Sequence, residues 1–157
     1  MKTNAVRLVE EAGAPYRLAE YEVDESDLSA QTVARKIGMP AEQVFKTLVL
    51  RGDKHGLLVV LVPADAEIDM KAVAAASGNK QCEMLPLKEI QPVTGYVRGG
   101  VSPLGLKKRC PTYIDETAML YDTISVSAGL RGLQMILDPE DLIRLTEAAT
   151  GDFGRQA

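Results

Sequence analysis

The chain has 157 residues, of which 46% are apolar and 25% charged, which suits one globular domain spanning residues 1–157. A net charge of −4 argues against a general nucleic-acid binder, because such proteins are usually basic. Cys82 and Cys110 have neither the spacing of a zinc site nor the number of a disulfide framework. The longest apolar run, residues 57–62, is too short to span a bilayer, and the first residues lack a signal-peptide pattern. We therefore expect a soluble cytoplasmic protein without a metal or another cofactor.

The first half of the chain predicts helices and strands in alternation. Hydrophobic spacing and terminal glycines predict helices over residues 3–12 and 29–37, with Ser29 as a cap and Gly38 as the stop. Strands are predicted over residues 16–23, 44–51 and 57–62, with a short helical turn at 40–43 and a hairpin loop at 52–56.

The second half predicts shorter elements. These are a helix over 70–76 capped by Asp69, a strand near Cys82 and Met84, a single helical turn at 86–90, and strands at 112–115, 123–127 and 133–137. The last element is predicted to be a helix, with Asp138 as its cap. This order favours an α+β fold whose mostly antiparallel mixed sheet is curled into a barrel-like form with flanking helices.

The kind of catalysis is constrained by the lone histidine, His55, which lies in the predicted hairpin loop. A loop-tip histidine is usually only solvated, whereas a Ser-His-Asp or Cys-His site needs a positioned one. Any reaction at this chain is therefore expected to proceed without a histidine-activated nucleophile.

Lys46 is unusual because it lies within the apolar strand 44–51 and shares a face with Val44, Leu48 and Leu50, while Thr47 falls on the other face. A lysine there either extends its amine to water or anchors an anionic or hydroxyl group of a substrate.

A second candidate is the segment Gly99-Gly100-Val101-Ser102-Pro103-Leu104-Gly105. It is either a plain surface turn or a loop that aims backbone N–H groups at a ligand oxygen. The basic run Lys107, Lys108 and Arg109 follows it, and is either a solvated face or a contact for RNA phosphates.

A third candidate is the strand 123–127 with the turn that follows it. Thr123, Ser125 and Ser127 share one face, which is either solvent-exposed or part of a site. The turn presents Arg131, which is either solvated or a contact for a phosphate or ribose. Tyr21 reads as a core tyrosine when taken alone.

Together these segments resemble the YbaK family of Cys-tRNA deacylases, which are relatives of the editing domain of bacterial prolyl-tRNA synthetases. The similarity rests on Val44-Phe45-Lys46-Thr47-Leu48, Gly95-Tyr96, the segment 99–105 and Ser127-Ala128-Gly129-Leu130-Arg131-Gly132. Ala128 stands where some relatives have a glycine.

The resemblance implies that the protein removes cysteine from mischarged Cys-tRNA(Pro), and also from Cys-tRNA(Cys), by attack of the substrate's own thiol on its ester. It implies a catalytic group of Lys46, Gly99, Gly100 and Pro103, and substrate contacts from Tyr21, Thr47, Val101, Ser102, Ser127, Gly129 and Arg131. The implied partners are the acceptor end of aminoacyl-tRNA and prolyl-tRNA synthetase, with no role for DNA or membrane. Two alternatives remain: a deacylase for another small amino acid such as alanine, and a non-catalytic module that binds aminoacyl-tRNA or a synthetase.

Overall fold

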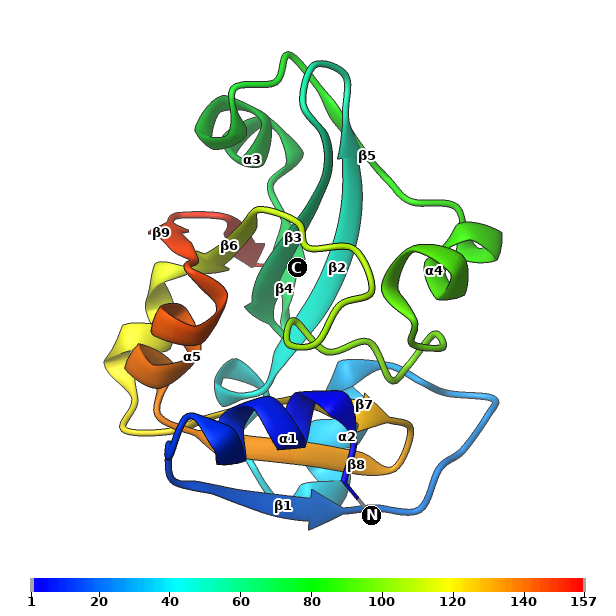
Figure 1. Cartoon of the computed structure of the whole chain (residues 1–157), viewed down its shortest axis with the longest axis vertical. Coiled ribbons are helices and arrows are strands. Elements are labelled where there is room, and N and C mark those ends of the chain that lie inside the picture. Colours follow the sequence, from blue (N-terminus) through cyan, green and yellow to red (C-terminus); the bar gives the residue numbers. More distant parts are fainter. Residues whose placement is uncertain (1, 157) are drawn as a thin grey trace.

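The computed structural model describes residues 2–156, and its strands form three separate sheets (Figure 1). The strands are β1 (Tyr16–Glu20), β2 (Phe45–Gly52), β3 (Gly56–Pro63), β4 (Ala66–Ile68), β5 (Cys82–Met84), β6 (Thr112–Asp115), β7 (Ile124–Leu130), β8 (Leu133–Leu137), β9 (Ala149–Gly151) and β10 (Gly154–Gln156). The largest sheet has the order β5–β2–β3–β6–β9, the second has the order β1–β8–β7, and β4 pairs with β10.

Three of the helices begin at the capping residues that the sequence indicates. The helices are α1 (Asn4–Glu11), α2 (Ala30–Ile37), α3 (Met70–Ser77), α4 (Leu87–Thr94) and α5 (Pro139–Thr146), with 3-10 helices η1 (Ala41–Gln43) and η2 (Glu116–Leu120). The side chains of Ser29, Asp69 and Asp138 accept backbone N–H groups at the starts of α2, α3 and α5. α4 is longer than the single predicted turn, because it continues through Pro92 to Thr94.

The pairing of the strands confirms a mixed, mostly antiparallel architecture but not a barrel. β2 pairs antiparallel with β3 and β5, and β8 pairs antiparallel with β1 and β7, whereas β3–β6 and β6–β9 are parallel. The prediction of a barrel-like sheet was wrong, since the three described sheets are open. The prediction that a helix is the last element was also wrong, because β9 and β10 follow α5.

β2 separates two parts of the hydrophobic core. Phe45 and Val49 are buried in the main cluster, which also contains residues of α1, β7 and β8. Leu50, on the alternate face, is buried in a second cluster with Val60 and Val62. An isolated bridge between Val44 and Ser125 joins the start of β2 to β7, so the two larger sheets meet there.

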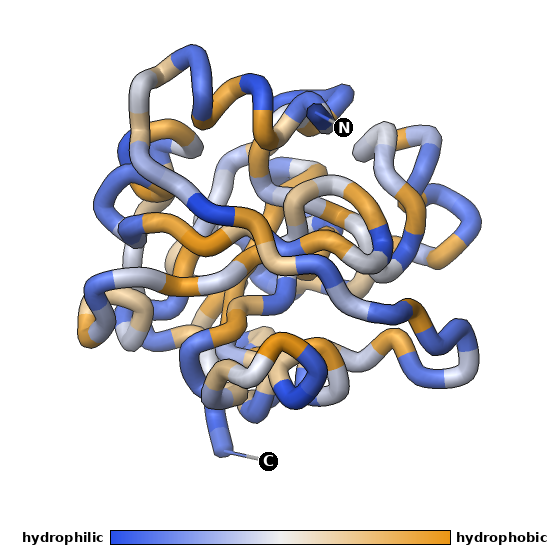
Figure 2. The backbone as a smooth tube through the Cα atoms, turned by 90° about the horizontal axis from the view of Figure 1, so that it is seen from below, coloured by the Kyte–Doolittle hydropathy of each residue, from blue (hydrophilic) through white to orange (hydrophobic). Residues whose placement is uncertain are grey.

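Figure 1 shows the sheet β1–β8–β7 with α1 at one end of the molecule, and the β2–β3 hairpin extending from it toward α3. The loop that leads from α4 to β6 returns across β2 and β3. In Figure 2 the hydrophobic stretches of the backbone cross the middle of the molecule and hydrophilic stretches form much of its outline. Within residues 2–156, no helix is long and apolar enough to cross a membrane.

Candidate active site

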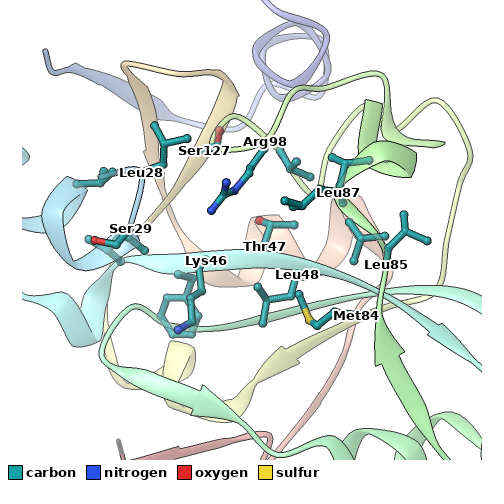
Figure 3. Close-up of a pocket in the computed structure, with 18 of the residues that line it drawn as sticks. Leu28, Ser29, Lys46, Thr47, Leu48, Met84, Leu85, Leu87, Arg98 and Ser127 are labelled. Atoms are coloured by element: carbon teal, nitrogen blue, oxygen red, sulfur yellow. The ribbon is translucent and has the colours of Figure 1, made fainter. Parts of the chain in front are cut away.

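A pocket of about 290 Å³ lies where β2, the start of α2, α4 and the loop after α4 come together (Figure 3). β2 and the residue before it contribute the consecutive residues 44–49 to its lining. Lys46, Thr47, Gly99, Val101 and Ser127, all expected from the sequence to be site residues, line this one pocket. The structure therefore brings together three segments that are far apart in the chain.

The pocket is built on a free edge of β2. β5 pairs only with residues 50–52 of β2, and the N–H of Leu85 extends this pairing to the carbonyl of Val49 at 3.0 Å. In the part of the chain that the structure describes, no strand pairs with this edge between the contacts of Val49 and Val44. Because alternate residues of an antiparallel strand direct their N–H and C=O groups to the same edge, the peptide groups of Thr47 face the pocket as those of Val49 face β5.

Lys46 and Thr47 leave β2 on opposite sides, as strand alternation predicts. Figure 3 shows Lys46 on the side of Leu48 and Thr47 on the side of Arg98. The pocket thus wraps around the strand edge, with a cation reaching one half and a hydroxyl reaching the other.

The charge of Lys46 is partly desolvated. Burial lowers the pKa of the Lys46 ammonium, while the negative charges of Glu67 and Asp65 act in the opposite direction. Lys46 is partly buried and lines the pocket, a position that fits the second sequence reading, an amine that anchors a substrate group; that role remains a prediction.

Thr47 has a buried hydroxyl without a partner. Its Oγ1 is inaccessible to solvent and makes no hydrogen bond to any residue of the described range 2–156. An unpaired buried hydroxyl costs about 1–3 kcal/mol, so such groups are retained mainly where a ligand or water satisfies them.

The polar face of β7 is buried. Of the two sequence alternatives for this face, the solvent-exposed one does not apply to Ser125 and Ser127. Ser125 is fully buried and its Oγ donates to Oε1 of Gln134 at 2.8 Å, while Oγ of Ser127 accepts the N–H of Gly129 at 3.2 Å. Gln134 is only 5% exposed and lines the pocket. Sequence reasoning missed Gln134, because a glutamine that alternates with apolar residues on β8 looks like an outward-facing residue.

The glycine-rich loop is fixed by contacts within itself and with the turn after β7. The Tyr96 hydroxyl donates to the carbonyl of Leu104 at 2.6 Å, and the N–H of Gly100 donates to the carbonyl of Val97 at 2.9 Å. Gly99 has a φ of +85°, and a Cβ on Gly100 would lie 3.0 Å from backbone atoms of Leu130 and Arg131. The first two glycines are thus required for the conformation and for the close approach of two loops.

Other expected site residues lie outside the lining of this pocket. Ser102 is fully buried and accepts the N–H of Leu104 at 3.2 Å, and Pro103 lines a separate cavity of about 180 Å³. Gly129 has a φ of +100° and packs against Tyr96. Tyr21 follows β1 and its N–H donates to the carbonyl of Gly132 at 3.0 Å. Their substrate contacts remain predictions.

The basic residues after the loop are not in the pocket lining either. Arg109 forms an exposed ion pair with Glu147 at 3.0 Å, and Lys107 and Lys108 are exposed. By contrast, Arg98, which was not among the expected site residues, lines the pocket. Its position directly before Gly99-Gly100 was the available signal.

Comparisons with known proteins find relatives among aminoacyl-tRNA editing proteins. The sequence model of the aminoacyl-tRNA editing domain matches residues 24–145. EbsC of Enterococcus faecalis, a proposed Cys-tRNA(Pro)/Cys-tRNA(Cys) deacylase, is 49% identical over 145 residues, which are 92% of this chain and 88% of EbsC. The Escherichia coli multifunctional Ser/Thr-tRNA deacylase ProXp-y is 22% identical over 97% of this chain and 92% of its own length.

A solved structure extends the similarity to three dimensions. The crystal structure of a proposed trans-editing enzyme for prolyl-tRNA synthetase superposes with a TM-score of 0.82 at 25% identity, over 99% of both chains. The match of the sequence model covers most of this chain, and it includes Lys46, Gly99 and Ser127 of the pocket. This protein belongs to the YbaK family of aminoacyl-tRNA editing domains.

Proposed function

We propose that this protein is a trans-editing deacylase that removes cysteine from mischarged Cys-tRNA(Pro) and, by the same chemistry, from Cys-tRNA(Cys). The observation that carries the proposal is the pocket of about 290 Å³ on the free edge of β2, with Lys46 and the unpaired Thr47 hydroxyl in its lining. A cavity of this size can hold the cysteinyl side chain together with its ester. The name of EbsC, at 49% identity, supports cysteine as that amino acid.

The cysteinyl ester supplies its own nucleophile. The thiol sulfur attacks the ester carbonyl carbon, the bond from that carbon to the ribose oxygen breaks, and the thiol proton is transferred to the leaving ribose oxygen. The products are a cyclic thioester of cysteine and free tRNA, so this reaction consumes no oxidant or cofactor. Such a reaction needs the protein chiefly to orient the ester and to stabilise negative charge on the carbonyl oxygen.

Two sets of groups are proposed for these tasks. Gly99 and Val101 line the pocket, and within residues 2–156 neither N–H group takes part in a backbone–backbone hydrogen bond, so both are candidates to bind the carbonyl oxygen. Lys46 is proposed to hold the ester or the terminal ribose by charge and hydrogen bonding. Gly100 and Pro103 would shape the loop rather than touch the substrate.

The remaining tRNA contacts are proposed to come from prolyl-tRNA synthetase. The chain has a net charge of −4, and its densest basic run is Lys107, Lys108 and Arg109. A partner that already holds the tRNA would supply the missing affinity, in the cytoplasm where translation takes place. The name of the structurally similar trans-editing enzyme for prolyl-tRNA synthetase supports this partnership.

The test is release of labelled cysteine from Cys-tRNA(Pro) under multiple-turnover conditions, with and without prolyl-tRNA synthetase. Lys46→Ala is expected to lower the rate by about a hundredfold, the usual effect of removing one electrostatic donor. Lys71→Ala, an exposed lysine of α3, is the matched control and should behave like the wild type. Undiminished turnover by Lys46→Ala would remove Lys46 from the mechanism.

A panel of other charged tRNAs separates cysteine from rival substrates. Because Ser-tRNA lacks the thiol, its deacylation is expected to be much slower than that of Cys-tRNA. Rapid serine or alanine release would instead indicate attack by water and a broader specificity, as the name of the Escherichia coli relative suggests for that protein. Binding without any turnover would indicate a non-catalytic module.

A further inference from the structure

The charged residues that line the pocket are cations, although the protein as a whole is acidic. Two charged residues, Lys46 and Arg98, are among the described residues that line it, and both are cations. The lining within residues 2–156 includes no aspartate or glutamate, while the chain carries a net charge of −4. A cavity whose charged lining residues are all cations favours an anionic group on its ligand.

The two cations differ in how far their charge is already compensated. The negative charges of Asp65 and Glu67 act on Lys46. Arg98 forms no ion pair within the described range 2–156, where the ion pairs involve other arginines and Lys2. Arg98 is therefore the pocket cation that is best able to bind an anion.

The backbone of Arg98 is held in place. Nε of Arg131 donates to the carbonyl oxygen of Arg98 at 2.7 Å, and the next residue, Gly99, has the left-handed φ of +85°. Figure 3 shows the Arg98 side chain extending toward the side of β2 from which Thr47 projects, with Ser127 nearby. An arginine with a fixed backbone loses less freedom on binding than a freely mobile surface arginine.

The chemistry of the proposed substrate identifies the anion. At the end of an aminoacyl-tRNA the α-amino group is positive and the ester is neutral. The nearest negative charge is the phosphate on the 5′ oxygen of the terminal ribose, one sugar away from the ester. A planar guanidinium donates two parallel hydrogen bonds to a phosphate, a geometry that lysine does not provide.

We propose that Arg98 binds the phosphate of the terminal nucleotide and so makes the site specific for a nucleotide ester over a nucleoside ester. This inference rests on the deacylase function proposed above. It assigns one phosphate contact within the pocket itself, independently of the basic run at residues 107–109.

The test combines variants of Arg98 with substrates that either carry or lack the 5′ phosphate. The substrates are the cysteinyl ester of adenosine and the cysteinyl ester of adenosine 5′-monophosphate, and the measured quantity is kcat/KM. The wild type is expected to prefer the phosphorylated ester by about tenfold to a hundredfold, the range of a hydrogen bond to a charged group. Arg98→Ala should abolish this preference, and Arg98→Lys should keep a small part of it. Arg17→Ala, an exposed arginine of β1, should keep it fully.

The outcomes separate the two proposals. Arg98→Ala enzyme that retains the full preference for the phosphorylated ester would overturn the role of Arg98 while leaving the deacylase function intact. If the wild type releases cysteine from neither ester nor from Cys-tRNA(Pro), the proposed function is overturned. The phosphate contact of Arg98 is then tested by calorimetry, which compares the binding of adenosine 5′-monophosphate with that of adenosine. Equal binding of the two by the wild type would refute the phosphate contact, and a preference lost in Arg98→Ala would uphold it.

Discussion

Arg131 and Arg98, 33 residues apart in the chain, are joined by a hydrogen bond of 2.7 Å from the Nε of Arg131 to the carbonyl oxygen of Arg98. The same guanidinium lies 4.0 Å from the carboxylate of Glu25. Arg131 therefore connects the turn after β7 to the glycine loop of the pocket. This position suits a residue that orients Arg98 and Gly99, beside the direct substrate contact expected from the sequence.

Arg131→Ala is expected to lower kcat/KM for Cys-tRNA(Pro) by about tenfold, the usual value of a hydrogen bond from a charged donor. If Arg131 acts by positioning Arg98, its effect should shrink when Arg98 is already alanine, which a double-mutant cycle measures. Additive effects of the two substitutions would show that Arg131 contacts the substrate independently.

Thr47→Val tests whether the unpaired hydroxyl of Thr47 serves a ligand. Valine keeps the shape and removes a buried group that has no protein partner, so the free energy of unfolding should rise by about 1 kcal/mol in urea denaturation. Deacylation should fall, because the ligand loses that contact. Thr112→Val is the matched control, since Oγ1 of Thr112 donates to the carbonyl of Cys110 at 3.2 Å and its loss should destabilise the fold. A destabilised Thr47→Val protein would contradict the assignment.

Gly100→Ala tests the close approach of the two loops. The added Cβ would meet the backbone nitrogen of Arg131 and the backbone carbon of Leu130 at 3.0 Å, and backbone atoms cannot rotate away. We expect a loss of about 1–3 kcal/mol in the free energy of unfolding together with lower activity, as for other overpacked sites.

Gly154→Ala is the comparison variant for Gly100→Ala. Its Cβ would lie 3.2 Å from the Cβ of Ala66, outside the lining of the pocket, so any loss should be of stability and not of activity per folded molecule. Full activity and stability in Gly100→Ala would show that the two loops can separate without consequence.

The start of α2 is expected to make stability depend on acid pH. Hydrogen bonds from Thr32 and Ser29 lower the pKa of the Asp27 carboxyl to about 2. Because the folded-state pKa lies below the ordinary value of about 3.9, this stabilisation is fully present above pH 4 and is lost as the pH falls toward 2. Leu28 and Ser29 line the pocket, so this loss also loosens its wall.

The variant Asp27→Asn tests whether the Asp27 carboxylate stabilises the fold above pH 4 and stops doing so in acid. Its deficit in the free energy of unfolding relative to the wild type should be constant from pH 7 to about 5 and should shrink as the pH falls toward 2. The exposed Asp122→Asn variant serves as the control in the same urea titrations. A deficit that stays constant down to pH 2.5 would refute the contribution of the Asp27 carboxylate.

The elements that local sequence specifies were predicted well. α2 lies where Ser29 and Gly38 place it, because a capping hydroxyl and a left-handed glycine with φ of +72° act within one turn of the helix. β2 and β3 follow from their apolar residues and the short loop between them. α4 extends beyond its prediction through Pro92 to Thr94, whose hydroxyl donates to the carbonyl of Ile90 at 2.7 Å in the last turn.

The missed elements depend on contacts between distant residues. β9 and β10 have only three residues each and no apolar alternation. They are held in part by Asp115, whose Oδ1 accepts the N–H groups of Phe153 and Gly154 at 2.8 and 2.9 Å. No pattern within residues 149–156 indicates an acceptor about 38 residues earlier.

The candidate site also combines residues that the local sequence indicates with residues that only distant contacts bring into place. Lys46 and the glycine loop stand out because each is unusual for a strand or a loop, and Thr47 was expected only from the resemblance to the family. Gln134 and Arg98 do not stand out, since a glutamine in a strand and an arginine near a turn are ordinary residues. Only the register that sets Ser127 opposite Gln134, and the bond from Arg131, place them at the pocket.

The open edge of β2 has a consequence for how this fold can diversify. Peptide N–H and C=O groups are the same for every amino acid, so no substitution within residues 45–48, proline excepted, removes them from the cavity. The side chains around them can therefore exchange and change which amino acid fits, while the main chain keeps its polar groups at the strand edge. Such an arrangement would let one scaffold acquire new substrate preferences by substitution of the side chains that line the pocket, while the polar groups of the strand edge stay in place.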